Sequence, residues 1–516
     1  MDREAREKAD QRNADKATQS GSPFRRPQEI TRRGRMIYRW ATRAERPRRI
    51  VGAVSTTSRT LSFLAILGPG GLERDRSIEI APDGTIRAIR ATRAGDAPRD
   101  GGLAVPGMPN AHSHIFQCAL AGFGEEARGD DSFWSWRRAM YRLANSITPE
   151  QLFDIARHGY ACMLRAGFTH VVEFHYLHHG PNGARGPESS QAVLAAAEEV
   201  GLPISLLPVY YRTAGFDGAP PHEGQRRFAH DSVDEFMAAV EALSPAVAGV
   251  APHSLRAVPT ADLAELVAGV DAALGREAPL HIHVSEQELE VEECLAVRGR
   301  TPIDLLADTV ELGPRWSLVH ATHATEAERA RLRSAGAGVV LCPITEAHLG
   351  DGIFPAREHF LAGGAAAVGS DANVRISAIE EARQLEYGQR LRDRRRARLA
   401  TEAGAGSVVW SWLAEGGGEA AAVRPRSAGG AGAPMRLGRI EPGYRADFVV
   451  LDREGPHTMG HDWETVMDAW LVGGDERDIE AVYVGGERRV EGGSVTGEDE
   501  IRSAYGKAMR GIRRAI

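Results

Sequence analysis

Cysteine is scarce in this sequence. The 516 residues include only four cysteines, and no two of them form a CxxC pair. A disulfide framework and a cysteine zinc motif both need more closely spaced cysteines, so neither is expected. Scattered, unpaired thiols are typical of a reducing compartment, and we therefore expect a cytoplasmic protein. The four cysteines are Cys118, Cys162, Cys294 and Cys342.

Long apolar runs are also absent. The longest runs have the length of a strand and fall well short of the roughly 18 residues that a membrane span requires. The N-terminus carries charges throughout and lacks the apolar core of a secretory signal. An apolar content of 42% and a charged content of 26% are typical of a globular protein. We expect no membrane partner, and the length suits one large catalytic domain plus a smaller one.

The negative net charge of −7 is unevenly distributed. Residues 1–50 hold 15 Lys/Arg against 7 Asp/Glu and have few apolar side chains, so we expect residues 1–58 to be a disordered basic arm. A basic arm can contact nucleic acid, but a plain flexible extension is the simpler interpretation. For the run "RLRDRRRAR" (390–398) a solvated helix face is favoured over an RNA contact. We therefore expect no nucleic-acid partner.

The middle of the chain alternates between short apolar runs and helix-like stretches. Eight such strand-then-helix units are typical of an α/β protein with a (β/α)8 TIM-like barrel, which we expect over residues 106–415. The runs are "LAVPGMPNAHSH", "THVVEFHY", "ISLLPVYY", "AVAGVAPHS", "LHIHVSE", "WSLVHATH", "AGVVLCP" and "AAAVGSDA".

The two ends of the chain share a different, strand-rich pattern. Short strands separated by turns occur at 59–105 and again at 435–495, which predicts a small β-sandwich domain built from both termini. We expect a loose Gly/Ala-rich connector at 416–434, because its composition is that of a flexible linker, and a C-terminal helix at 496–516.

Polar side chains recur where the predicted barrel strands end. The carboxyl ends of barrel strands form the active-site face, so these residues are expected to meet there. A set of unrelated surface loops gives no reason for histidines to recur at these points. The residues are His112, His114, His175, His253, His283, Glu286, His320, His323 and Asp371.

A metal site accounts for the end residues of strands one, five and eight. His112 and His114 alternate along an extended segment and point to the same side of it, so both can face one ion. His283 and Asp371 can complete a four-ligand set. Imidazole nitrogens with one carboxylate suit Zn²⁺, and Fe²⁺ is also possible. The fourth strand offers no lysine to bridge a second metal, so one ion per chain is expected.

The motifs "HSH", "HIHVSE", "LVHATH" and "GSDA", in this order, resemble the amidohydrolase superfamily in its mononuclear deaminase branch. The segment "EPGYRADFVVLD" is similar to the C-terminal β-sandwich strand of that superfamily. Within the superfamily, the chain resembles the formimidoylglutamate deiminases of histidine degradation over about residues 60–495. That likeness depends on "PGMPNAHSHIFQ", "DSFWSWR", "EFHYLHH", "PHSLRAV", "CPITEAHLGDGIFP" and "LEYGQRLRDRRR".

The resemblance implies a hydrolase acting on a C–N bond of a linear amidine. A divalent ion lowers the pKa of a bound water towards about 7, and the resulting hydroxide attacks a carbon bonded to nitrogen so that ammonia leaves. Glu286 would carry protons to the leaving nitrogen. Asp371 would be both a ligand and a candidate base, and His320 would orient or polarise the reacting group. The implied reaction converts N-formimino-L-glutamate to N-formyl-L-glutamate.

A glutamate-derived substrate brings two carboxylates, which favour guanidinium groups and neutral donors. The resemblance assigns that role to Gln117, Arg137, Tyr176, His253 and Arg256. Position alone supports His253 and Arg256, which lie just beyond the fourth strand. For Arg137, a surface helix charge is the alternative.

Two alternatives to this function remain open. A related deaminase acting on guanine or another amino-heterocycle would have no need of two arginines. A non-catalytic barrel would lack metal ligands, which are present here. His348 and Asn373 depart from the family pattern without removing a ligand, and both bear on substrate fit. The family also implies a homodimer.

Overall fold

The structure is a computed structural model that describes residues 31–32, 35–36, 58–96, 100–123, 125, 133–181, 183–402, 404–421 and 435–513. The arm expected at 1–58 lies outside the described residues, apart from residue 58 and two short strands, β1 (Thr31–Arg32) and β2 (Arg35–Met36), which pair antiparallel. The described residues from 58 onward belong to one compact unit.

Eight parallel strands in the described residues form the barrel. They pair as two four-stranded sheets in the orders β7-β8-β9-β10 and β11-β12-β13-β14. Bridges from Val250 to Leu280 and from Ser254 to His283 join the sheets on one side, and a bridge between Ser113 and Asp371 joins them on the other. The expected (β/α)8 barrel is therefore confirmed. The strands are β7 (Met108–Ser113), β8 (Phe168–His175), β9 (Ile204–Tyr210), β10 (Ala251–Pro252), β11 (Leu280–Val284), β12 (Trp316–His320), β13 (Gly338–Leu341) and β14 (Ala366–Val368).

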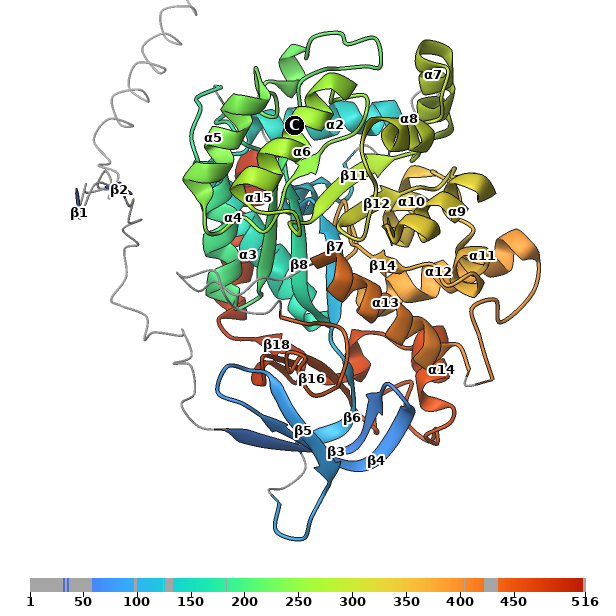
Figure 1. The fold of residues 1–516 in the computed structure, drawn as a ribbon. Coiled ribbons are helices and arrows are strands. Elements are labelled where there is room, and N and C mark those ends of the chain that lie inside the picture. The colour runs from blue at the N-terminus through green and yellow to red at the C-terminus, as the bar shows by residue number, and fades with distance from the viewer. Residues whose placement is uncertain are drawn as a thin grey trace, which may run out of the picture. The chain divides into compact units, whose positions relative to one another are not determined.

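Helices follow the barrel strands and surround them (Figure 1). Several begin with a Ser or Thr that caps the first turn, as Thr325 does by accepting a hydrogen bond from the Glu328 amide. None of the helices in the described part of the chain is long and apolar enough to cross a membrane. They are η1 (Ile115–Leu120), α2 (Phe133–Ser146), α3 (Pro149–Arg165), α4 (Glu188–Val200), η2 (Glu223–Gln225), α5 (Val233–Leu243), α6 (Thr260–Ala273), α7 (Glu288–Arg298), α8 (Pro302–Thr309), α9 (Glu326–Ala335), α10 (Pro343–Leu349), α11 (Ala356–Leu361), α12 (Ala378–Asp393) and α13 (Gly406–Ala421).

The β-rich domain expected from both termini is present. Its strands form one eight-stranded sheet in the order β18-β17-β16-β15-β6-β3-β4-β5. Figure 1 shows the blue N-terminal strands beside the red C-terminal ones, at the end of the barrel where β6 leads into β7. Its elements are β3 (Arg59–Gly68), β4 (Gly71–Ile80), β5 (Ile86–Ala91), β6 (Gly101–Pro106), β15 (Phe448–Leu451), α14 (Val466–Gly473), η3 (Glu476–Asp478), β16 (Ile479–Val484), β17 (Glu487–Glu491), β18 (Ser494–Val495) and the following α15 (Glu498–Ile512).

The connector expected at 416–434 is wrong in its first part, because α13 continues to Ala421; residues 422–434 lie outside the described residues. The glycines at 416–418 serve close packing instead of flexibility. A Cβ on Gly416 would lie 2.0 Å from the carbonyl oxygen of Ala366 on β14, and one on Gly418 would lie 2.3 Å from that of Leu437. Only glycine therefore lets α13 approach β14 and the Leu437 backbone so closely.

Candidate metal centre and active-site cavity

The metal-ligand residues lie where the two half-barrels join. At the junction of β7 and β14, the His114 amide donates to the Asp371 carbonyl (2.9 Å), and the Asp371 amide donates to the His112 carbonyl (3.0 Å). A Cβ on Gly369 would lie 2.6 Å from the His112 Cβ, so the glycine of "VGSDA" is needed for this contact. At the junction of β10 and β11, the His283 amide donates to the His253 carbonyl (3.1 Å).

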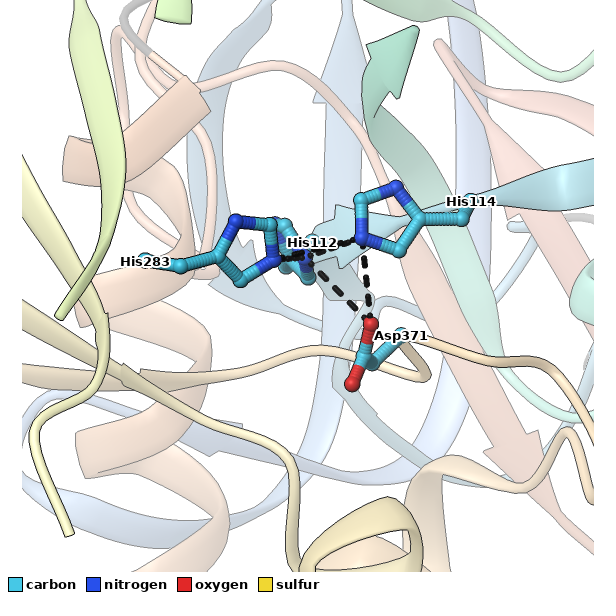
Figure 2. A group of neighbouring side chains, drawn as sticks. All are labelled: His112, His114, His283 and Asp371. Carbon is cyan, nitrogen blue, oxygen red and sulfur yellow. Dashed lines mark hydrogen bonds and ion pairs between the residues drawn. The ribbon is translucent and has the colours of Figure 1, made fainter. Parts of the chain in front are cut away.

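The four predicted ligands converge on one point (Figure 2). The three Nε2 atoms of His112, His114 and His283 lie 3.1–3.3 Å from one another. The Asp371 Oδ1 lies 3.4 Å from the His112 Nε2 and 3.3 Å from the His114 Nε2. Atoms with such separations can all lie about 2 Å from a common centre, which is the length of a bond from Zn²⁺ to nitrogen or oxygen.

The protonation of the histidines also fits a metal. The Nδ1 of His114 donates to the Phe174 carbonyl (2.9 Å), and the Nδ1 of His283 donates to the His253 carbonyl (3.0 Å). A carbonyl only accepts, so Nδ1 carries the proton and the Nε2 lone pair faces the centre. Burial lowers the pKa of His112 to about 3 and that of His283 well below its usual value, so the rings are neutral ligands at pH 7.

His320 and Glu286 lie beside this centre. The His320 Nε2 lies 3.7 Å from the Glu286 Oε1 and 3.7 Å from the Asp371 Oδ2. Burial opposes the charging of His320, but the charge of Glu286 and a hydrogen bond to Glu346 outweigh it and raise the His320 pKa to about 10. Burial raises the pKa of Glu286, against the opposing charge of His320. The pair therefore combines a proton acceptor with a proton-holding imidazole, both within reach of one reacting group.

Several residues at these strand ends have left-handed backbone conformations. The φ angles are 66° at His320, 43° at Asp371 and 51° at Ser285. Such angles are uncommon for residues other than glycine, and they gather at functional sites where the surrounding structure enforces them. At Asp371, Asn373 contributes by donating to the Asp371 carbonyl (2.7 Å) and to the Ser113 hydroxyl (3.2 Å).

One cavity collects ten of the eleven residues expected in the site, and His112 lies fully buried beside it. Arg137, for which a surface helix charge is the alternative expectation, is among the ten; its Nη2 donates to the Tyr211 hydroxyl (3.4 Å). The Gln117 amide donates to the Tyr176 hydroxyl. The ten residues are His114, Gln117, Arg137, Tyr176, His253, Arg256, His283, Glu286, His320 and Asp371.

Four other positions considered from the sequence do not line this cavity. His175 lies at the end of β8 with its ring 5.7 Å from that of His178, and His323 donates to the Asp351 carbonyl (2.9 Å). His348 pairs with Glu125 (2.7 Å), and Asn373 supports the Asp371 turn. The two departures from the family pattern are therefore outside the cavity lining.

Sequence reasoning missed the aromatic and apolar lining of the cavity. Tyr211 directly follows β9, so extending the strand-end rule from polar to aromatic residues would have identified it. The residues from α2 carry no strand-end signal. The missed residues are Trp136, Met140, Tyr141, Tyr211, Phe228 and Leu349.

The fold and this site define a (β/α)8 barrel with a candidate mononuclear metal centre of three histidines and one aspartate. The family model described as Amidohydrolase family matches residues 103–410. The chain is 42% identical over 451 residues to the formimidoylglutamate deiminase of Pseudomonas aeruginosa, an alignment that covers 85% of this chain and 96% of the relative. The chain therefore belongs to the amidohydrolase family.

One further sequence relative and two solved structures extend the comparison. A 5-methylthioadenosine/S-adenosylhomocysteine deaminase of Halobacterium salinarum is 29% identical, with 80% of this chain and 88% of the relative covered. The crystal structure of an amidohydrolase from Brucella melitensis is 39% identical with a TM-score of 0.79, covering 88% and 99%. An adenosine deaminase from Xanthomonas campestris, solved with bound zinc, has a TM-score of 0.70 at 21% identity, covering 88% and 98%, and shows the fold alone.

Proposed function

We propose that this protein catalyses the hydrolysis of N-formimino-L-glutamate to N-formyl-L-glutamate and ammonia. The observation that carries the proposal is one cavity that joins a three-histidine, one-aspartate centre to two arginines, Arg137 and Arg256. A metal centre serves attack on an amidine carbon, and two guanidinium groups suit a substrate with two carboxylates. The identity of 42% to a formimidoylglutamate deiminase supports the same substrate.

The reacting groups have separate roles in this proposal. One divalent ion would be held by His112, His114, His283 and Asp371, a ligand set that suits Zn²⁺, and the ion would supply hydroxide from water at neutral pH. The water oxygen bonds to the amidine carbon, the bond from that carbon to its terminal nitrogen breaks, and ammonia leaves. Asp371 and Glu286 are the proton acceptors for the water.

Glu286 then gives the proton to the departing nitrogen, and His320 polarises the reacting group. The separation of 3.7 Å between His320 and Glu286 supports this assignment, because one small group can contact both side chains. Gln117, Arg137, Tyr176, His253 and Arg256 would hold the rest of the substrate, with the arginines on its carboxylates.

The same proposal includes a place in histidine catabolism, a cytoplasmic location and a homodimer. The first follows from the substrate, the second is supported by the four scattered free cysteines, and the third rests on the family resemblance. The domain organisation expected from the sequence, with barrel residues 106–415 between β segments 59–105 and 435–495, belongs to it as well.

Ammonia release tests the proposal directly. Purified protein with measured metal content is assayed with N-formimino-L-glutamate, N-formimino-L-aspartate and guanine. We expect the value of kcat/KM for the glutamate derivative to exceed the values for the other two compounds. Turnover of guanine alone would favour an amino-heterocycle deaminase and contradict the proposal. Protein that binds no metal and releases no ammonia from any of them would support the non-catalytic alternative.

Arg256 is the sharpest test of substrate choice. Truncating one partner of a buried charge pair typically costs about 2–5 kcal/mol, so Arg256→Met should lower kcat/KM for N-formimino-L-glutamate by at least about tenfold. Part of the loss should appear in KM, because the contact is made before and during the reaction. Metal content should stay unchanged.

An analogue that lacks one carboxylate should be affected less by Arg256→Met. Arg212→Met is the matched control, since Arg212 also follows a barrel strand but pairs with Asp262 (2.7 Å) outside the cavity lining. If Arg256→Met affects both substrates equally, Arg256 does not bind a carboxylate.

A further inference from the structure

Glu346 lies behind His320 and has no role in the function proposed so far. It is on α10, within the segment "CPITEAHLGDGIFP", and it is buried. Its Oε1 lies 3.2 Å from the His320 Nδ1, and the Glu346 side chain does not line the cavity. Glu346 therefore acts on any substrate only through His320.

The contact fixes which nitrogen of His320 faces the cavity. A carboxylate only accepts hydrogen bonds, so the His320 Nδ1 must be the donor to Glu346. The His320 Nε2 is then turned toward Glu286 and Asp371, at 3.7 Å from each carboxylate. If the ring turned over by 180°, a carbon would replace Nε2 at this position and the contact with Glu346 would be lost.

Glu346 is itself held in place by the backbone. Its Oε1 accepts a second hydrogen bond from the Cys342 amide (2.8 Å) at the start of α10, where backbone N–H groups favour a negative charge. The backbone carbonyl of Glu346 accepts a hydrogen bond from the Asp351 amide (2.9 Å). The backbone and the carboxylate of Glu346 are thus both held in place, which allows this residue to orient the His320 ring.

We propose that Glu346 is a positioning residue for the reaction, one that holds the His320 ring with Nε2 in the cavity. The proposal rests on the proposed function for its kinetic part. Its structural part, the Nδ1–H···carboxylate contact, holds whatever the substrate is. A second use of Glu346, as support for α10 alone, is the alternative that the experiment excludes.

The variants are E346Q and, as a matched control, E381Q. Glutamine keeps the size of the side chain and an acceptor oxygen but removes the charge. Glu381 is also buried and accepts a hydrogen bond from the Ile344 amide of α10 (3.0 Å), but the carboxylates that pair with His320 are those of Glu286, Glu346 and Asp371. Both variants disturb the support of α10, and only E346Q disturbs His320.

The kinetic readout is the split between kcat and KM with N-formimino-L-glutamate. Loss of a group that orients a catalytic side chain typically costs about 10–100-fold, so we expect that decrease in kcat for E346Q. KM should stay within about threefold of the wild-type value, because His320 acts on the reacting bond. E381Q should keep wild-type kinetics, and all three proteins should hold the same amount of metal. Equal kinetics for E346Q and E381Q would overturn the proposal.

A spectroscopic readout needs no substrate. In protein labelled with ¹⁵N-histidine, the His320 Nδ1 proton should give a strongly deshielded resonance, which is assigned by its loss in His320→Asn. This resonance should shift upfield in E346Q and stay in place in E381Q. Its absence from the wild type would overturn the proposal even if E346Q failed to fold. If the wild type releases no ammonia while the resonance behaves as expected, the proposed function fails and the positioning contact stands.

Discussion

Glu286 is the single residue on which the proposed proton transfers depend. It is 6% exposed, lies in the cavity beside His320, and is not one of the four candidate metal ligands. Glu286→Gln should therefore keep the metal and the fold while losing most turnover. Positioned acid–base groups contribute about 10²–10⁴-fold, and we expect kcat to fall within that range.

The measurement for Glu286→Gln is kcat together with metal content and the melting temperature. Glu288→Gln, two residues away on the exposed start of α7, is the control and should behave as the wild type. A Glu286→Gln variant with near-normal kcat would show that another group moves the proton.

The buried carboxyl group of Glu173 makes the stability of the protein depend on pH. It is buried on β8, accepts a hydrogen bond from the Ile115 amide (2.8 Å) and another from the Tyr160 hydroxyl (3.3 Å), and so supports η1, which carries Gln117. Burial outweighs these hydrogen bonds and raises its pKa from 4.5 to about 8. A raised carboxyl pKa means that the folded state binds this proton more tightly than the unfolded state.

The sign of the pH effect follows. The protonated Glu173 adds stability in full below about pH 4.5, the contribution falls as the pH rises, and it is lost above about pH 8. We expect the unfolding free energy of the wild type, relative to Glu173→Gln, to decrease between pH 5 and pH 8 and then level off. Comparison with this variant isolates Glu173 from other buried carboxyl groups. A difference that is constant with pH would contradict the raised pKa.

Among the elements, the barrel strands were predictable from the sequence, whereas the contribution of α2 to the cavity lining was not. Each barrel strand is buried on both faces, so it appears as a short apolar run, and its end appears as a polar residue next to it. The ligands His112, His114, His283 and Asp371 could be found for that reason. The lining from α2 could not, because a helix that covers a cavity has the same pattern as one that covers a core.

The failure at α13 has a physical cause that the sequence does not display. Three consecutive glycines are typical of a flexible connector, yet here they allow a helix to touch β14 and β7. Composition alone cannot distinguish a glycine chosen for freedom from one chosen for its lack of a side chain. Tertiary packing decides between the two.

Alanine substitutions at two helical glycines test whether close packing explains the glycines of α13. In Gly416→Ala the new Cβ would lie 2.0 Å from the Ala366 carbonyl oxygen, so α13 or β14 must move, and overpacking of this kind costs about 1–3 kcal/mol. In Gly388→Ala on α12 the nearest atom is an Ile353 carbon at 3.5 Å, an ordinary contact. There, alanine should gain up to about 1 kcal/mol from its higher helix propensity. Denaturant unfolding measures the unfolding free energy, which should fall in Gly416→Ala and rise in Gly388→Ala. Equal changes in the two variants would contradict this account of α13.

In the molecule beyond the N-terminal arm, the barrel and the β domain share their core. Strand β15 alternates along its length: Phe448 and Val450 face the core of the β domain, whereas Val449 and Leu451 pack in the same cluster as the barrel interior. Strand β6 does the same with Ala104 on one side and Leu103 on the other. Both faces of the central strands are therefore buried, and β6 leads directly into β7, which carries the first two candidate ligands.

Because one core joins them, the β domain and the barrel should unfold in a single transition. Calorimetry of the wild type should show one peak. Phe448→Ala removes a ring that packs 5.9 Å from Phe63 in the core of the β domain, and it should cost about 3–5 kcal/mol. Leu318→Ala on β12 removes a buried barrel side chain, at a cost of about 2–5 kcal/mol. Each variant should move the same peak to lower temperature.

A control variant and the number of calorimetric peaks distinguish joint unfolding of the two domains from separate unfolding. Leu391→Ala removes a side chain that is 76% exposed and should leave the peak in place. Two peaks, with Phe448→Ala lowering one and Leu318→Ala the other, would show that the domains unfold separately. Phe448 is also far along the chain from every proposed ligand and does not line the cavity. Below its melting temperature, Phe448→Ala should therefore keep the wild-type kcat and metal content, since the β domain contributes stability to the barrel and no side chain to its active site.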